Sequence, residues 1–145
     1  MGATPSQAAA LQEIRSLLGP SGCIDAPAAM QRFLVDFRGL HRGATPFVAC
    51  PADTAQVAAV LAVCHDARIG VVPQGGNTSY CGGATPSAAG DQLVLSLQRL
   101  DRVRAVDAAN FSLVAEAGCV LATVQAAAES ADRLFPLALG SEGSC

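Results

Sequence analysis

A glycine-rich stretch between two apolar segments holds the clearest chemical pattern in the chain. Residues 71–86 read VVPQGGNTSYCGGATP, in which Gly75-Gly76 and Gly82-Gly83 form two glycine pairs. Glycines let the backbone come close to a ligand, and consecutive N–H groups can converge on an anion. The neighbouring Gln, Asn, Thr and Ser side chains add neutral hydrogen-bonding groups. The stretch therefore predicts either a cradle for a phosphate or diphosphate, or a long turn that binds nothing.

The rest of the sequence excludes several classes of phosphate and catalytic site. The chain contains no lysine, and its nine basic residues are all arginines. A Walker-type phosphate loop and a pyridoxal Schiff base both need a lysine, so neither can be completed here. The glycine spacing is not G-x-G-x-x-G, and a strand rather than a helix is expected after it, which disfavours a Rossmann site. There is also no G-x-S-x-G nucleophile elbow.

Cysteines, histidines and charges limit the partners that we expect. The six cysteines include no C-x-x-C pair and there are only two histidines, so no metal site is predicted. Neither His41 nor His65 stands in a pattern that indicates a catalytic base. The arginines are scattered among acids, so no nucleic-acid partner is expected. We predict reduced, mostly buried thiols and a cytoplasmic location, free or peripheral to a membrane, because neither a signal peptide nor an apolar run of ~20 residues is present.

Composition favours a folded domain, and hydrophobic periodicity places its helices. Of the 145 residues, 51% are hydrophobic and 14% are charged. Helices are predicted over residues 6–18, 55–68 and 121–131, with a short helical turn at Pro27 and a loop over residues 36–45. The expected caps and stops are Ser6, Gly19, Asp53 and Gly70. The expected buried faces of the first two helices contain Leu11, Ile14, Leu17, Leu18, Val57, Val60, Leu61 and Cys64.

Short apolar or alternating runs predict the strands. They cover residues 46–50, 69–72, 92–97, 102–107 and 112–117. The second of these strands leads directly into the glycine-rich loop and the third follows it, so the loop connects two strands. A turn is expected at residues 107–110, between the last two strands.

Several spaced motifs together resemble a known family. PQGGNTSYCGGATP follows VACPADTAQVAAVLAVCHDARIGVV and precedes QLVLSLQRLDRV, with EAGCVLATVQ and FPLALGSEGSC further along. In this order they resemble the FAD-binding domain of the FAD-linked oxidase superfamily, which is the vanillyl-alcohol-oxidase or PCMH type. The similarity is greatest to the branch that contains glycolate oxidase, D-lactate dehydrogenase and D-2-hydroxyglutarate dehydrogenase, and it runs over residues 36–145.

The resemblance implies an α+β fold and FAD as the cofactor. Residues 1–35 would form a helical lead-in, and residues 36–145 the N-terminal subdomain and the beginning of the second subdomain of a PCMH-type domain. Two loops would bind the cofactor, through Pro73, Gln74, Gly75, Gly76, Asn77, Thr78, Gly82 and Gly83 in the first, and through Pro136, Gly140, Gly143, Ser144 and Cys145 in the second.

Three positions of these loops differ from patterns known in the superfamily. Members that bind flavin covalently have a histidine where this chain has Asn77, so non-covalent FAD is expected. Ser79 replaces a glycine that is frequent in this branch. Glu142 is an acid that would repel phosphate, so its side chain is expected to point away from the diphosphate.

The resemblance also implies oxidation of a D-2-hydroxy acid, of the D-lactate, glycolate or D-2-hydroxyglutarate type, by hydride transfer to FAD. In this family the catalytic and substrate-binding residues lie in a later cap region, so no catalytic residue is predicted here and the electron acceptor is not named. The chain stops within a Gly/Ser-rich segment, and we expect it to be an inactive piece of a longer protein. The alternatives are a nucleotide- or phosphate-binding α/β module without catalysis and a purely structural fragment.

Overall fold

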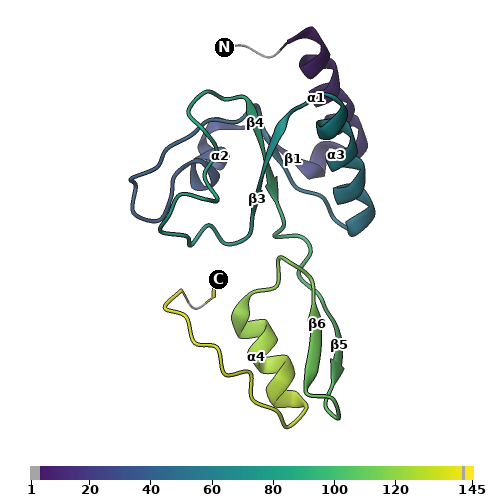
Figure 1. The fold of residues 1–145 in the computed structure, drawn as a ribbon, viewed down its shortest axis with the longest axis vertical. Helices are drawn as coiled ribbons and strands as arrows, with labels where there is room; N and C mark the ends of the chain where they lie inside the picture. Colours follow the sequence, from purple (N-terminus) through teal and green to yellow (C-terminus); the bar gives the residue numbers. More distant parts are fainter. Residues whose placement is uncertain (1–3, 142) are drawn as a thin grey trace.

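The computed structural model describes residues 4–141 and 143–145, which form two layered units (Figure 1). The larger unit contains a four-stranded sheet with the strand order β1-β2-β4-β3. β1 is antiparallel to β2, whereas β2, β4 and β3 run parallel to one another. The strands are β1 (Cys23–Ile24), β2 (Val48–Ala49), β3 (Gly70–Gln74) and β4 (Gln92–Ser96).

Helices cover both faces of this sheet, because side chains alternate between its faces. Helices α1 (Pro5–Leu18) and α3 (Thr54–Asp66) pack on one face, where the core includes Leu93 and Leu95 of β4. Helix α2 (Pro27–Leu34) packs on the other face, where Val94 belongs to a second core cluster with Met30, Phe33, Val48 and Cys50. The central strand β4 is therefore buried on both sides, as expected for a parallel sheet.

The glycine-rich loop connects two parallel neighbours in the sheet. Residues 75–91 leave the carboxyl end of β3 and return to the start of β4 without forming a helix. The carboxyl ends of parallel strands lie at the same edge of a sheet, and this is the edge at which open α/β sheets bind ligands. The chain that follows β4 starts at this same edge, so two connecting segments meet there.

The smaller unit packs one helix on a hairpin. Strands β5 (Val103–Asp107) and β6 (Ser112–Ala115) pair antiparallel, and α4 (Leu121–Ser130) packs against β5. The predicted turn between the strands is confirmed. The Asp107 carboxylate accepts hydrogen bonds from the backbone N–H groups of Ala109 and Asn110, each at 3.1 Å.

A buried carboxylate joins the smaller unit to the larger one. The side chain of Glu116 is 1% exposed and accepts hydrogen bonds from the guanidinium groups of Arg102 and Arg104, each as close as 3.0 Å. Arg104 also donates to Thr54 Oγ1 at 3.0 Å, at the start of α3. The hydrogen bonds from Arg102 hold the pKa of Glu116 down at about 2. No sequence pattern predicted this ion-pair cluster.

The structure corrects several predicted details of the first helix and of the segment that follows it. Thr4 caps α1 in place of Ser6, because its hydroxyl accepts from the backbone N–H of Gln7 while the Gln7 side chain accepts from Thr4 N–H. Leu17 is 45% exposed rather than buried. The short turn at Pro27 is an eight-residue helix, and the two-residue strand β1 was not predicted.

The third helix also ends differently from the prediction. It stops at Asp66, and Arg68 adopts the left-handed conformation (φ 52°) in the position expected for a glycine. Ile69 N–H then donates to Cys64 O at 2.8 Å, which completes a Schellman-type end, while Gly70 begins β3. Leu61, predicted to be buried, is 42% exposed.

Fewer cysteines are buried than the sequence predicted. All six are free, but only Cys50 and Cys64 are buried, while Cys81 is exposed. In the described part of the chain, no helix is long and apolar enough to cross a membrane.

Candidate functional site

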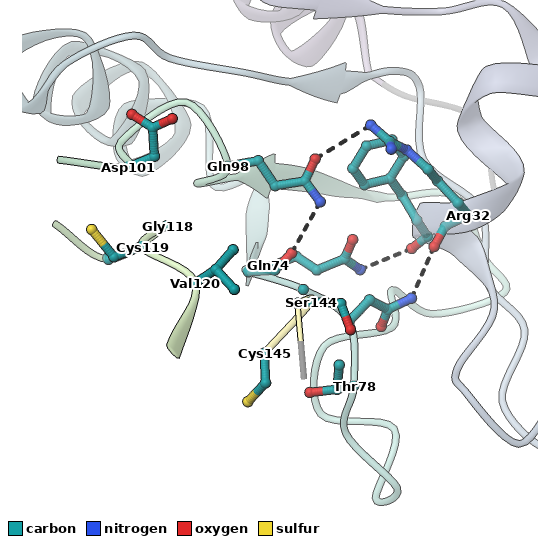
Figure 2. Close-up of a pocket in the computed structure, with 16 residues that line it drawn as sticks. Arg32, Gln74, Thr78, Gln98, Asp101, Gly118, Cys119, Val120, Ser144 and Cys145 are labelled. Carbon is teal, nitrogen blue, oxygen red and sulfur yellow. Dashed lines mark hydrogen bonds between the residues drawn. The ribbon is translucent and has the colours of Figure 1, made fainter. Parts of the chain in front are cut away.

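A cavity of about 650 Å³ opens where the two units meet, beyond the carboxyl ends of β3 and β4. One wall is the start of the glycine-rich loop, residues 74–78. The opposite wall is the segment 117–120, which leads into α4, together with residues 143–145. Figure 2 shows side chains from both walls around the same space. The cavity thus joins the two segments that the sequence motifs placed far apart.

The loop wall presents backbone donors. The N–H groups of Gly75, Gly76, Asn77 and Thr78 donate to no other residue within the described chain. Consecutive free N–H groups of this kind are suited to an anion. Asn77 has a φ of 55°, a left-handed conformation that asparagine tolerates better than most residues. The wall therefore offers the chemistry of an anion nest without any lysine.

The two walls touch each other at a glycine. A Cβ atom at Gly76 would overlap the carbonyl oxygen of Ser144. In turn, Cys145 O accepts a hydrogen bond of 2.6 Å from Leu121 N–H, at the start of α4. Residues 143–145 therefore contact both the glycine-rich loop on one side and the start of α4 on the other.

A second glycine fixes the other wall. Gly118 N–H donates to Leu100 O at 2.8 Å, and a Cβ atom at Gly118 would overlap the carbonyl oxygen of Leu97. Only a residue without a side chain allows the wall to approach the end of β4 this closely. Cys119 and Val120 extend this wall toward α4.

The sequence indicated that the side chains of Gln74 and Asn77 bind the cofactor, but in the structure their amide groups donate to the protein backbone. Gln74 is 1% exposed, and its Nε2 donates to Phe33 O at 3.0 Å and to Ala84 O at 2.7 Å. Asn77 Nδ2 donates to Arg32 O at 2.9 Å and to Val35 O at 2.8 Å. Both amide groups thus bind backbone carbonyls at the end of α2.

One arginine and one aspartate bring charge to the cavity. Arg32 extends over the ring of Phe33, 4.5 Å from its centroid, and donates to Gln98 Oε1 at 3.3 Å. Gln98 Nε2 then donates to Gly75 O at 3.4 Å. Within the described residues Arg32 forms no ion pair, so its positive charge faces the cavity without a carboxylate partner. Asp101 lies on the side of the smaller unit.

The structure brings together eight of the thirteen residues predicted to bind the cofactor. Those that line the cavity are Gln74, Gly75, Gly76, Asn77, Thr78, Gly143, Ser144 and Cys145. The other five, which do not line it, are Pro73, Gly82, Gly83, Pro136 and Gly140. Glu142 lies outside the described residues, so its predicted orientation has no counterpart here.

The second glycine pair occupies the far turn of the loop. Gly82 has a φ of 70°, and a Cβ atom there would meet the ring of His41 at 2.7 Å. Gly82 O accepts from Thr85 N–H at 3.0 Å, which closes a turn. This glycine therefore serves loop packing in the structure, while the first pair lies at the cavity.

Sequence reasoning missed the other half of the lining. These residues are Arg32, Phe33, Gln98, Asp101, Ala117, Gly118, Cys119 and Val120. Gln98 and Asp101 belong to the motif QLVLSLQRLDRV and the last four residues to EAGCVLATVQ, whereas Arg32 and Phe33 lie outside the motifs that carry the family resemblance. Among residues 4–141 and 143–145, no three His, Cys, Asp or Glu side chains gather as metal ligands would.

Comparison with known proteins agrees with this geometry. Residues 45–145 match the model of a family described as "FAD binding domain". A protein of Oryza sativa subsp. indica, named as a probable mitochondrial D-2-hydroxyglutarate dehydrogenase, is 36% identical over 90% of this chain and 23% of its own length. The D-2-hydroxyglutarate dehydrogenase of Bos taurus is 35% identical over 87% of this chain and 23% of its own length. A Schizosaccharomyces pombe protein named as a D-lactate dehydrogenase is 32% identical over 93% of the chain and 27% of its own length.

Solved structures show the same fold at low sequence identity. Alkyldihydroxyacetonephosphate synthase superposes with a TM-score of 0.73 at 16% identity, over 85% of this chain and 25% of that one. p-Cresol methylhydroxylase with substrate bound also gives 0.73, at 18% identity, over 90% of this chain and 26% of that one. The chain thus spans about a quarter of the length of the proteins it matches.

The donors of the cavity fit the cofactor that the family binds. FAD contains a diphosphate, and its negative charge suits the N–H groups at residues 75–78 and the guanidinium of Arg32, none of which has an acceptor or carboxylate partner of its own in the described segments apart from Gln98 Oε1. The family match covers both walls of the cavity. This chain belongs to the FAD-binding domain family of the FAD-linked oxidoreductases.

Proposed function

We propose that the natural protein containing these residues oxidises a D-2-hydroxy acid, and that this chain holds its FAD. The observation that supports the cofactor site is the cavity whose two walls both lie within the segment that matches the family model. The support for the substrate class is the similarity to relatives named as dehydrogenases of D-2-hydroxyglutarate and D-lactate. Because the chain spans about a quarter of those relatives, the activity belongs to the larger protein.

Each wall has a separate task in this proposal. The backbone N–H groups of Gly75–Thr78 bind the diphosphate, and Arg32 lowers the electrostatic cost of its charge. Residues 118–120 and 143–145 close the opposite side, where they orient the cofactor and exclude water from it. Bound FAD supplies the two-electron acceptor for the α-hydrogen of the substrate. No residue of this chain is assigned a catalytic role.

Pro73, Gly82, Gly83, Pro136 and Gly140 stay predicted cofactor contacts that the cavity does not include. The domain boundary at residue 36 and the cytoplasmic location likewise stay predictions, and the electron acceptor stays unnamed. The names of the relatives place those proteins in mitochondria.

We also propose that the flavin is bound without a covalent bond. Neither His41 nor His65 lines the cavity, and Asn77 occupies the position after the glycine pair. Acid precipitation of the purified natural protein tests this. Yellow colour released into the supernatant is the expected result, whereas colour that stays with the precipitate would contradict it.

Anaerobic mixing of the natural protein with candidate substrates tests the activity. D-lactate, glycolate and D-2-hydroxyglutarate are each added, with L-lactate and L-2-hydroxyglutarate as matched controls. We expect at least one of the three substrates to bleach the flavin absorption band, and neither L-enantiomer to do so. A flavin that no 2-hydroxy acid bleaches would remove the substrate class but leave the cofactor. A protein that binds no flavin would favour the alternative of a nucleotide-binding module.

A further inference from the structure

The C-terminal end of α2 is held by the glycine-rich loop. A helix leaves its last four carbonyl groups without partners inside the helix. Here Asn77 Nδ2 donates to Arg32 O at 2.9 Å and to Val35 O at 2.8 Å, and Gln74 Nε2 donates to Phe33 O at 3.0 Å. The donors lie 41 to 45 residues away from these carbonyls in the sequence. The loop therefore caps a helix that belongs to a distant segment.

The two amide groups have no donors left for another partner. The two hydrogens of Asn77 Nδ2 go to Arg32 O in α2 and to Val35 O directly after it, while Gln74 Nε2 binds Phe33 O and also Ala84 O, at 2.7 Å. The reverse orientation of either amide would place its oxygen against carbonyl oxygens, so the orientation is fixed by the acceptors. Gln74 thus connects the start of the loop, its far arm and α2.

These hydrogen bonds act on the part of the loop that presents the free N–H groups. Asn77 is itself one of the four residues whose N–H faces no protein acceptor in the described chain, and its φ of 55° turns the chain there. Gly76, directly before it, touches Ser144. Loss of the contact with α2 would therefore let the anion nest change shape even though the nest residues remain.

The capping also reduces the negative charge that the end of α2 presents to the cavity. The C-terminus of a helix carries a partial negative charge of about half an electron, which disfavours a nearby anion. Amide donors on the terminal carbonyls of α2, and the positive charge of Arg32 in its last turn, both oppose this effect. Without them, the end of α2 would repel a diphosphate in the cavity.

We infer that Asn77 and Gln74 are positioning residues, whose side-chain N–H groups hold the FAD loop in its binding shape by capping α2 rather than by donating to the cofactor. Helix α2 thereby becomes part of the cofactor site, although it lies before the segment that matches the family model. The inference rests on the proposed binding of FAD by residues 75–78.

Two substitutions of Asn77 separate positioning from direct contact. Asn77→Gly keeps the left-handed backbone accessible but removes the donor, and Asn77→Asp keeps the shape but turns a charged acceptor toward two carbonyl oxygens. We expect the Kd for FAD to rise about ten- to hundredfold in N77G, because two hydrogen bonds are lost, and further in N77D. A side chain that bound FAD through its oxygen would give the opposite order, with N77D closer to the wild type.

Hydrogen exchange of the FAD-free chain supplies a readout that direct contact would not change. We expect amides of α2 and of residues 75–85 to exchange faster in N77G than in the wild type. Gln74→Met, which is similar in volume but has no donor, is expected to give the same pattern. Gln7→Ala is the control, since it removes the capping-box bond from Thr4 N–H and a bond of 3.5 Å to Arg68 O, both outside the cavity, and it should alter neither exchange in α2 nor the Kd.

Each outcome decides the inference. Weaker FAD binding together with unchanged exchange in α2 would assign Asn77 to the cofactor and overturn it, and so would an unchanged Kd in N77G. A wild-type chain that binds no FAD would instead remove the proposed function. In that case, exchange in α2 would still report on the capping, and unaltered exchange in N77G would overturn it.

Discussion

At the scale of single residues, Gly76 is the position where the cavity tolerates least change. A Cβ atom there would overlap Ser144 O, so any side chain must push residues 143–145 away from the loop. We predict that Gly76→Val lowers the FAD content of the purified protein by at least about tenfold, because the two walls can no longer both reach the cofactor. Flavin absorbance per protein measures this.

The control for this substitution adds bulk to the same loop outside the cavity. Ala89 is exposed and does not line the cavity, so Ala89→Val should retain the flavin. If G76V retained as much flavin as A89V, the contact between the walls would be irrelevant to binding, and the structural-fragment hypothesis would gain support.

At the scale of elements, the sequence predicted helices and strands well where the residues of a segment alone determine its secondary structure. The helices 6–18 and 55–68 and the long strands appear within a few residues of the predicted bounds. The errors occur where distant contacts decide. Strand β1 is two residues long and pairs with β2, and the eight-residue helix α2 packs Met30 and Phe33 into a core cluster and is capped from residues 74 and 77.

The same reason explains which site residues could be predicted. Residues 74–78 and 143–145 lie in glycine-rich motifs that are visible in the sequence. Arg32, Gln98 and Asp101 stand in ordinary helix and turn contexts, and only the packing of α2 and the exit of β4 bring them to the cavity. The directions of side chains also could not be predicted from the sequence. The amide groups of Gln74 and Asn77 were expected to face the cofactor, but in the structure they cap a helix.

The connection between the hairpin and α3 predicts a specific dependence of stability on pH. The pKa of Glu116 is about 2 in the folded chain, below its usual 4.5, owing first to the hydrogen bond from Arg102. The unfolded chain therefore takes up this proton first as the pH falls. The contribution of Glu116 to the free energy of unfolding is complete above about pH 4.5 and is lost as the pH falls toward 2.

We predict that Glu116→Gln lowers the melting temperature at pH 7 and makes stability depend less on pH between about 4.5 and 2. Circular dichroism melts across this range provide the measurement. Asp25→Asn removes the ion pair with Arg15, in which Asp25 is 65% exposed, and should change the melting temperature little. An E116Q variant as stable and as acid-sensitive as the wild type would show that the buried cluster does not hold the hairpin in place.

At the scale of the whole molecule, the cavity lies between two units whose described helices and strands pack little against each other. Apart from the Glu116 cluster, the exit of β4 and the contact of Gly76 with Ser144 join them. A cofactor that contacts both walls would therefore connect the two units more firmly. Binding that bridges two units stabilises each of them against local opening, whereas binding to one wall stabilises only that unit.

We predict that FAD at a hundred times its Kd stabilises the chain by about 2.7 kcal/mol and raises its melting temperature by about 5–10 °C. Hydrogen exchange should then slow both at residues 75–78 of the larger unit and at residues 118–124 of the smaller one. ADP, which has the diphosphate but no flavin, should protect the first segment more than the second. The G76V variant should show neither the shift in melting temperature nor the protection from exchange. Protection by FAD that is confined to the larger unit would mean that residues 118–120 do not form a wall of the site.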